Sequence, residues 1–353
     1  MLKYCIGFLL FLQVFYVYAD NLLGLPKLTI PVSNQQSEEK IALGKQLFND
    51  KRLSLDGTVS CASCHNKDRA FTDGQPVAVG INQQTGFRNA PTVVNAAFYQ
   101  SLFLDGRSAT LEEQALGPFV NPIEHGLKDP QHIADIVSQD SNYRQQFARV
   151  FNVNEITPEH IAQAIASFER TLIAGNSGFD RYLFARERQA LTLSEARGMR
   201  LFRRKGNCAN CHEISGKDAL FMDNRFYNLG IGFTQVNPQI AEFVQSLRVG
   251  HKTEDFSFSD SQKAELGRFN VTFVIADIGK FKTPTLRNIA LTAPYMHDGS
   301  IKTLAEVVEY YDRGGDKNPF LDPAIFPLHL TAQEKLDLVA FLKALTSEQH
   351  QSK

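Results

Sequence analysis

Two stretches of the chain carry apolar side chains at helical spacing, each after a helix-start signal. Thr157-Pro158 precedes one apolar face, made of Ile161, Ala164, Ile165, Phe168 and Leu172. Thr331, with Glu334 three residues later, precedes a second face, made of Leu338, Phe341, Leu342 and Leu345. Because Thr-Pro and Thr-x-x-Glu both favour a helix start, the pattern predicts two core-facing helices. Short strands are predicted only around 77–79 and 271–275, so most of the chain is predicted to be helical.

The second half of the chain repeats sequence features of the first. Gly44-x-x-Leu47-Phe48 recurs as Gly198-x-x-Leu201-Phe202. Pro91-Thr92-x-x-Asn95, Asp105-Gly106 and Thr110-Leu111-x-Glu113 recur, at the same mutual spacings, as Pro284-Thr285-x-x-Asn288, Asp298-Gly299 and Thr303-Leu304-x-Glu306. This self-similarity predicts an internal duplication of one domain. The loop-like run at 175–178 places the boundary at 178, giving domains 20–178 and 179–353, and the stretch 221–281 has no counterpart.

The composition is that of a globular protein. Of the 353 residues, 43% are hydrophobic and 21% are charged, and 37 Lys and Arg oppose 38 Asp and Glu. This balance leaves no basic surface for nucleic acid, so nucleic acid is excluded as the leading partner. The chain has five cysteines, too few for a disulfide scaffold of this length.

The first residues resemble a secretory signal. Lys3 precedes an apolar run over 6–18, and Val17-Tyr18-Ala19 offers small residues at a cleavage site. The run is shorter than the ~20 apolar residues of a membrane span, so a removed signal at 1–19 is favoured over an anchor. We therefore expect export, with loss of Cys5, which leaves four cysteines in two pairs.

Those pairs form two Cys-x-x-Cys-His motifs, Cys61-Ala62-Ser63-Cys64-His65 and Cys208-Ala209-Asn210-Cys211-His212. This spacing attaches a c-type haem through two thioethers, and the histidine supplies the proximal iron ligand. A redox dithiol or half of a zinc site would use the same Cys-x-x-Cys unit, but two copies in an exported chain favour two covalent haems.

The two copies differ thirteen residues after Asp-Gly. That offset reaches Pro118 in the first half and Tyr311 in the second. Proline has no ligand atom, whereas a tyrosine phenolate can bind ferric iron. If the helix overhangs the haem in each domain, the first iron is open to peroxide and the second is capped and stores electrons. The alternative is that Tyr311 and its neighbour Tyr310 only pack or form hydrogen bonds.

The chain resembles the bacterial dihaem cytochrome c peroxidase and MauG family over nearly all of its mature length. Besides the haem motifs, the resemblance rests on Arg88-Asn89-Ala90-Pro91-Thr92, Leu104-Asp105-Gly106-Arg107, Leu111-Glu112-Glu113-Gln114-Ala115, Gly117-Pro118, Asn121-Pro122-Ile123-Glu124, Pro284-Thr285-Leu286-Arg287-Asn288 and Pro294-Tyr295-Met296-His297-Asp298-Gly299. It implies an all-α fold of two cytochrome c domains with calcium between them. It also implies an N-terminal haem that reacts with hydrogen peroxide and a C-terminal haem that receives electrons.

The resemblance assigns further roles to single residues. Glu124 matches the family's distal glutamate and Gln114 its distal glutamine, a pair suited to moving a proton between the peroxide oxygens and holding the outer oxygen. Calcium would be held by the side chain of Asn89 and the backbone oxygens of Thr292 and Pro294. For His125 we favour a solvent-facing or hydrogen-bonding role over ligation.

The chain departs from the peroxidase pattern at named positions. Ile81 stands where many family peroxidases have a histidine that closes the N-terminal haem, and Tyr311, as in MauG-type proteins, stands where those peroxidases have a methionine ligand. Met296 is the alternative ligand to the second iron. The two tryptophan positions of the family are Leu104 and Gly206 here, and the chain has no tryptophan at all.

Three functions fit these features. The favoured one is a periplasmic dihaem peroxidase that reduces hydrogen peroxide to water with electrons from a small cytochrome c or copper protein. The second is a MauG-like oxidase that uses peroxide to modify a partner protein, and the third is a dihaem electron carrier without turnover. A homodimer is compatible with all three. The sequence does not decide the donor, the partner, the haem potentials or the oligomeric state.

Overall fold

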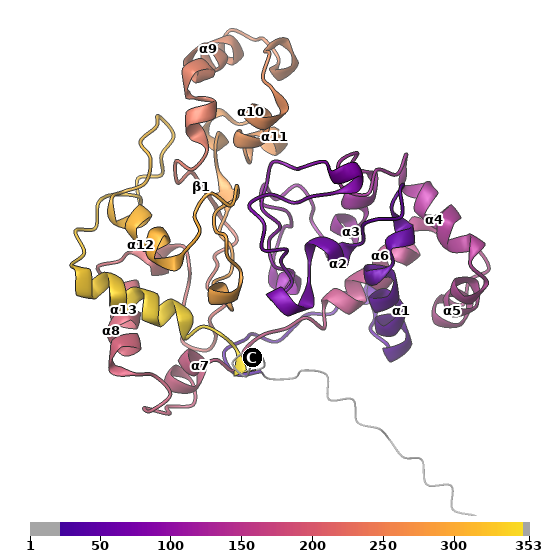
Figure 1. The fold of residues 1–353 in the computed structure, drawn as a ribbon, viewed down its shortest axis with the longest axis horizontal. Coiled ribbons are helices and arrows are strands. Elements are labelled where there is room, and N and C mark those ends of the chain that lie inside the picture. Colours follow the sequence, from indigo (N-terminus) through magenta and orange to yellow (C-terminus); the bar gives the residue numbers. More distant parts are fainter. Residues whose placement is uncertain (1–21, 349–353) are drawn as a thin grey trace, which may run out of the picture.

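The structure, a computed structural model, describes residues 22–348, so the predicted signal at 1–19 lies outside the described residues. Figure 1 shows a first half that holds α1 to α6 and a second half that holds α7 to α13. The helices are α1 (Glu38–Asn49), α2 (Cys61–Cys64), α3 (Leu111–Val120), α4 (Pro130–Gln139), α5 (Ser141–Phe151), α6 (Pro158–Glu169), α7 (Gly178–Leu183), α8 (Leu193–Arg203), α9 (Asn237–Arg248), α10 (Asp260–Glu265), α11 (Phe269–Thr272), α12 (Leu304–Asp312) and α13 (Ala332–Lys343).

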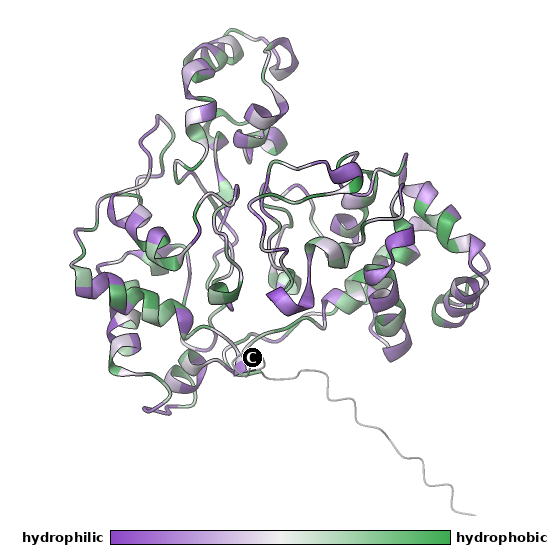
Figure 2. Cartoon of the chain, viewed as in Figure 1, coloured by the Kyte–Doolittle hydropathy of each residue, from purple (hydrophilic) through white to green (hydrophobic). Residues whose placement is uncertain are grey.

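The predicted helix starts are confirmed. Thr157 caps α6 with Pro158 in its first turn, and Thr331 forms a capping box with Glu334 at the start of α13. Thr110 and Thr303 cap α3 and α12 in the same way, since each hydroxyl accepts from the backbone N–H three residues later. The ribbons in Figure 2 mix hydrophilic and hydrophobic residues along each helix, as expected of helices with one buried face.

Each half contains one close helix crossing at a repeated glycine. A Cβ on Gly44 of α1 would lie 1.8 Å from Ala164 O of α6, and a Cβ on Gly198 of α8 would lie 1.9 Å from Asp337 O of α13. Only glycine allows the backbones to approach this closely, which explains why the Gly-x-x-Leu-Phe pattern recurs. Around these crossings lie two separate apolar clusters, one with members from Leu43 to Phe168 and one with members from Phe179 to Leu345.

The stretch 221–281 folds mainly into a small helical lobe. Its helices α9, α10 and α11 enclose their own apolar cluster around Phe243 and Phe269, both fully buried, and form the lobe at the top of Figure 1. The strand predictions were wrong. Val79 forms only an isolated bridge with Thr85, and 271–275 lies in and after α11, where Ile275 packs against the lobe's apolar cluster while Phe273 and Val274 are exposed. In residues 22–348, the strands are β1 (Phe226–Tyr227) and β2 (Phe281–Lys282), which pair antiparallel.

The two halves are joined through main-chain hydrogen bonds near β2. Lys282 N donates to Leu104 O at 2.8 Å, and the Arg268 guanidinium donates to Asp105 O and Gly106 O, both at 2.8 Å. Asp105 in turn forms ion pairs with Arg88 and Arg107 at 2.9 Å. The Asp105-Gly106 turn of the first half, whose counterpart in the second half is Asp298-Gly299, is therefore a contact point between the two halves.

The first described residues contact the second half as well as the end of the first half, where Leu23 O accepts from Asn176 N at 2.9 Å. Gly24 O accepts from Ala219 N at 2.9 Å and from the buried Arg287 guanidinium at 2.7 Å. Arg287 also forms a fully buried, bidentate ion pair with Asp180, at 2.7 and 2.9 Å. Within residues 22–348, no helix is both long and apolar enough to cross a membrane.

Candidate functional site

The first Cys-x-x-Cys-His motif lies on one helical turn. The cysteines Cys61 and Cys64 begin and end α2, which Ser60 and Ser63 close with a capping box, and His65 follows directly. Both cysteines are free thiols rather than a disulfide. Burial raises the pKa of the Cys64 thiol to about 12 and that of Cys208 in the second motif to a similar value. Such thiols are not poised as redox nucleophiles, which argues against the dithiol alternative.

The two motif histidines are held in the same way. His65 Nδ1 lies 3.2 Å from Phe71 O, and His212 Nδ1 lies 2.8 Å from Phe221 O. A bond at Nδ1 fixes the ring and leaves Nε2 for a metal ion, as proximal ligands require. Burial lowers the pKa of both histidines, which favours the neutral, ligating form.

Two threonines of the repeated Pro-Thr motif bond to the carbonyl of the residue that precedes each of these phenylalanines. Thr92 Oγ1 donates to Ala70 O at 2.6 Å, and Thr285 Oγ1 donates to Leu220 O at 2.7 Å, in each case the residue before the phenylalanine. Phe71 and Phe221 both have positive φ, 59° and 54°. The sequence reading missed the two phenylalanines because they lie six and nine residues after their histidines, so the duplication does not align them.

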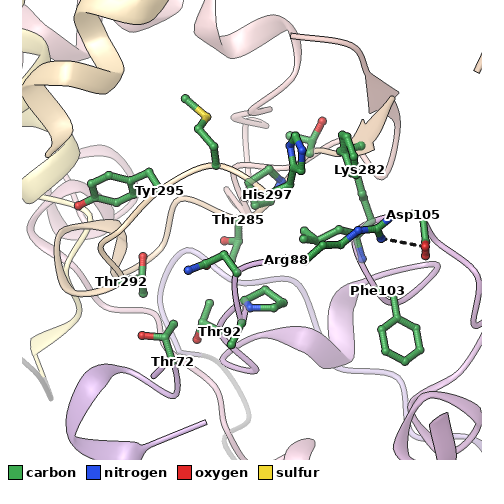
Figure 3. Close-up of a pocket in the computed structure, with 18 of the residues that line it drawn as sticks. Thr72, Arg88, Thr92, Phe103, Asp105, Lys282, Thr285, Thr292, Tyr295 and His297 are labelled. Carbon is green, nitrogen blue, oxygen red and sulfur yellow. Dashed lines mark hydrogen bonds and ion pairs between the residues drawn. The ribbon is translucent and has the colours of Figure 1, made fainter. Parts of the chain in front are cut away.

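Both motifs open into one continuous cavity of about 840 Å³. Its wall includes both histidines and all four cysteines and is mostly apolar elsewhere, as the site of a flat apolar macrocycle should be. Two buried oxygens in the wall, Glu169 Oε2 and Thr283 Oγ1, have no hydrogen-bond partner among the residues that the structure describes. Figure 3 shows residues of both halves lining this space, with Arg88 and Asp105 joined. The residues present fit haem c at each motif.

Above the first motif, the structure brings Gln114, Pro118 and Glu124 to the same cavity. Glu124 Oε1 accepts from Asn121 Nδ2 at 2.7 Å. Burial raises the pKa of the Glu124 carboxyl, while the charge of Arg107 and the Asn121 hydrogen bond oppose the rise. A carboxyl whose pKa is raised by burial exchanges a proton more readily than an ordinary surface carboxylate, which suits proton transfer.

His125 does not point to solvent. It is 4% exposed, its Nδ1 lies 2.8 Å from Leu53 O, and its ring packs against Phe119 with centroids 4.7 Å apart. Of the two roles expected for it, hydrogen bonding is confirmed and the solvent-facing one is wrong. His125 nevertheless lines the cavity beside Glu124.

Near the second motif, Tyr311 and Met296 both line the cavity. Burial raises the pKa of the Tyr311 hydroxyl, and the nearby thiols of Cys208 and Cys211 raise it further. The neighbouring Tyr310 instead points away, donating to Leu229 O at 2.8 Å and accepting from Asp316 N at 3.1 Å. Tyr310 thus has the hydrogen-bonding role of an ordinary tyrosine, whereas the Tyr311 hydroxyl makes no hydrogen bond with a described residue.

The predicted calcium ligands Asn89, Thr292 and Pro294 all line the same cavity. The Asn89 amide donates through Nδ2 to Gln75 O at 2.7 Å, which turns its oxygen toward other partners. In residues 22–348, no group of three or more His, Cys, Asp or Glu side chains could hold a metal ion, so the expected ligands would be amide and carbonyl oxygens. Calcium stays a prediction.

Three residues that depart from the peroxidase pattern, Ile81, Leu104 and Gly206, lie in different parts of the structure. Ile81 is 2% exposed and packs against Gly126, and its N–H donates to Glu124 O at 3.1 Å. Leu104 lines the cavity and bonds to Lys282 through its main chain, and Gly206 O accepts from Cys208 Sγ at 3.2 Å. None of these three residues offers a side-chain ligand or a redox-active ring.

Comparison with known proteins agrees with this site. A family model described as di-haem cytochrome c peroxidase matches residues 38–188, and one described as cytochrome c matches residues 195–346. The chain is 38% identical to the cytochrome-c peroxidase IdrP1 of Pseudomonas sp. (strain SCT), covering 91% of this chain and 84% of that one. It is 35% identical to the methylamine utilization protein MauG of Methylorubrum extorquens, covering 90% and 81%.

A solved structure agrees with these relatives. The crystal structure of a MauG-like protein associated with microbial copper homeostasis matches with a TM-score of 0.77 and 36% identity, covering 93% of this chain and 95% of that one. The two matched regions correspond to the two helical halves, and cytochrome c-type domains carry haem c at the motifs described above. The chain therefore belongs to the dihaem cytochrome c peroxidase family, which includes the MauG proteins, and is an enzyme of the cytochrome-c peroxidase type.

Proposed function

We propose that this chain is an exported, periplasmic peroxidase that binds one haem c in each half and reduces hydrogen peroxide to water with electrons from a small cytochrome c or copper protein. The observation that carries the proposal is the asymmetry between the two halves of the cavity. A carboxyl with a raised pKa, Glu124, and a non-ligating Pro118 lie near the first motif, whereas Tyr311 lies near the second. Glu124 can serve as the acid–base group for peroxide chemistry at the first haem. Tyr311 can serve as a ligand to the second haem, which would then store electrons.

When bound, the first haem supplies an iron that binds peroxide and passes electrons to it. Cys61, Cys64 and His65 would hold this haem, and Glu124 would take a proton from one peroxide oxygen at its carboxylate and give it to the other, so that with two electrons and two protons from the donor and the solvent peroxide becomes two waters. Asn121 orients the Glu124 carboxylate by donating to Oε1. Gln114 holds the outer oxygen through its amide, and Pro118 leaves the space free because it has no donor atom.

The test is Glu124→Gln, which keeps the size and removes the proton acceptor. Peroxide consumption with a reduced donor should slow by about 10²–10⁴-fold, as for other lost general acid–base groups. The rate of the unmodified enzyme should also fall as the pH drops through the raised pKa of Glu124, because a protonated carboxyl cannot accept. Glu155→Gln, at an exposed carboxylate away from the cavity, is the matched control. An unchanged rate for Glu124→Gln would refute the assignment.

A second candidate function is a MauG-like oxidation of a partner protein, favoured by the position of Tyr311 in the cavity. Leu104 and Gly206 count against it, since neither side chain can relay an oxidation. Incubation with peroxide and candidate partners, followed by mass spectrometry of the partner, separates this function from peroxide consumption with a donor. A third function, electron carriage without turnover, would show neither reaction.

We also propose that calcium is held between the halves by Asn89, Thr292 and Pro294. All three residues line the cavity, and amide and carbonyl oxygens suit this cation. A chelator should then lower activity, and added calcium should restore it.

A further inference from the structure

Four tyrosines line the cavity, and their hydroxyls have different partners. The four are Tyr99, Tyr227, Tyr295 and Tyr311. Tyr295 donates to a backbone carbonyl oxygen at 3.0 Å, and Tyr99 accepts from a backbone N–H at 2.7 Å. Among the residues that the structure describes, Tyr227 is the one cavity tyrosine that donates to a carboxylate, Asp223 Oδ2, at 2.6 Å. A carboxylate, unlike a carbonyl group, can take the proton of a phenol that is oxidised.

Asp223 is fixed in place as the partner of this phenol. Its Oδ1 accepts from the backbone N–H of Arg225 at 2.9 Å, which leaves Oδ2 for Tyr227. The next residue, Asn224, accepts through its Oδ1 from the backbone N–H of Gln100, in the first half, at 3.0 Å. The loop that carries Asp223 is therefore held by its own turn and by the junction of the two halves.

The same loop continues from the carbonyl group that holds the second motif histidine. Phe221 O lies 2.8 Å from His212 Nδ1, and Asp223 follows Phe221 by two residues. Two residues of fully extended chain span about 7 Å, so the Cα atoms of Phe221 and Asp223 can be no further apart than that. The Tyr227–Asp223 pair thus lies beside the second motif.

The strand β1 orients the ring of Tyr227. The other residue of β1, Phe226, faces the first half: a Cβ on Gly106 would lie 2.4 Å from its ring, and the Arg268 guanidinium lies 4.5 Å from its centroid. Successive side chains of a strand point to opposite faces. Tyr227 therefore points away from Gly106, to the side where Asp223 accepts its hydroxyl.

We infer that Tyr227 is a redox-active residue that gives one electron to the second haem after peroxide has oxidised the enzyme, and that Asp223 accepts the proton of its phenol. The inference rests on the proposed function, because hydrogen peroxide is the oxidant and a haem must be bound at the second motif. It adds a one-electron site to the iron ligands and to the acid–base group of the first half.

The electrons and protons of this step balance. The second haem gains one electron from the phenol of Tyr227, and the phenol proton moves along the hydrogen bond to Asp223 Oδ2. The products on the protein are a neutral phenoxyl radical and a neutral carboxylic acid. One electron from the small redox donor then reduces the radical, and the proton returns from Asp223. In a chain without tryptophan, tyrosine is the aromatic side chain that is oxidised most readily.

Rapid freezing after addition of peroxide without a donor, followed by electron paramagnetic resonance, tests this inference. The protein carrying both haems should show a tyrosyl radical, whose signal should narrow when the tyrosine rings carry deuterium. Tyr227→Phe should abolish the signal. Asp223→Asn keeps the size and removes the proton acceptor, so it should slow formation of the radical by about 10²–10⁴-fold.

Two control variants match Tyr227→Phe. Tyr143 also donates to a carboxylate, Asp50 Oδ2, at 2.8 Å, but lies outside the cavity wall. Tyr295 lies in the cavity wall but donates to a carbonyl oxygen. Tyr143→Phe and Tyr295→Phe should both keep the radical.

The outcomes separate this inference from the proposed function. A protein with two haems that consumes peroxide and shows no tyrosyl radical would overturn the inference and leave the proposed function standing. A radical that persists in Tyr227→Phe would do the same. A protein that consumes no peroxide would overturn the proposed function, and the inference with it. If Tyr227→Phe does not bind both haems, the rate of radical formation in Asp223→Asn decides.

Discussion

Tyr310 and Tyr311 are neighbours on α12, yet their hydroxyls have opposite surroundings. The Tyr310 hydroxyl has two backbone partners, at Leu229 and Asp316, and its ring lies nearly perpendicular to that of Tyr311. Tyr311 faces the cavity with its pKa raised by burial, a cost that coordination to a cation would remove. At the scale of single residues, this difference is the best reason to assign Tyr311, and not its neighbour, as an iron ligand.

Tyr311→Phe should therefore change the absorption spectrum and the potential of the second haem. The first step with peroxide at the other haem should persist, because Glu124 and Gln114 are unaltered. Met296→Leu serves as the comparison, since Met296 also lines the cavity. If Met296→Leu alters the spectrum and Tyr311→Phe does not, Met296 is the ligand.

Glu169, the last residue of α6, is a second residue with a testable titration. It is 4% exposed, and burial raises the pKa of its carboxyl from 4.5 to about 8, with Glu112 adding to the rise and Arg170 opposing it. The folded protein thus prefers the protonated form more than the unfolded chain does. The resulting stability is present below about pH 4.5 and is lost as the pH rises through about 8.

Glu169→Gln should remove this loss. We expect the variant to match the unmodified protein near pH 5 and to exceed it at pH 9, by on the order of a few kcal/mol in the free energy of unfolding. Thermal denaturation across this pH range measures the effect. Equal pH profiles for the two proteins would show that Glu169 is solvated.

At the scale of helices, the crossings at Gly44 and Gly198 fix the geometry around each motif. Gly44→Ala would place a methyl group 1.8 Å from Ala164 O, so α1 and α6 must separate. Overpacking of this kind costs about 1–3 kcal/mol, although alanine alone would favour the helix. Chemical denaturation should show the loss for Gly44→Ala and none for Gly216→Ala, where no atom lies within 4 Å of the added Cβ.

Much of this architecture could be predicted from local signals. Thr157, Thr331 and the motif cysteines act within a few residues of themselves, so spacing alone places their helices and turns. The strand prediction at 271–275 failed because a short apolar run does not distinguish a strand from the end of a helix, and the structure ends α11 at Thr272. Phe71 and Phe221 could not be assigned because their roles come from the direction of their backbone carbonyl groups, which side-chain patterns do not reveal. The structure brings together every predicted cavity residue, from Gln114 and Glu124 to Met296 and Tyr311.

At the scale of the whole molecule, residues of both Cys-x-x-Cys-His motifs line one cavity. Mass spectrometry of the purified protein should show two covalently attached haems. Cys208→Ser with Cys211→Ser should leave one, because thioether formation at the first motif needs only Cys61 and Cys64. A mass with one haem in the unmodified protein would contradict the two-haem assignment.

The contacts of Gly24 have a consequence for the order in which the chain can fold. During synthesis this residue leaves the ribosome well before its partners Ala219 and Arg287, which follow about 200 and 260 residues later. The first half can pack α1 against α6 while the second is still being made, since domains generally fold as units. Until the second half is made, the Gly24 carbonyl lacks these two partners, although Leu23 O can already accept from Asn176 N in the first half. The Gly24 contact can therefore form only late, after the second half has been synthesised. We expect a chain truncated before Arg287 to be cleaved by proteases near Gly24.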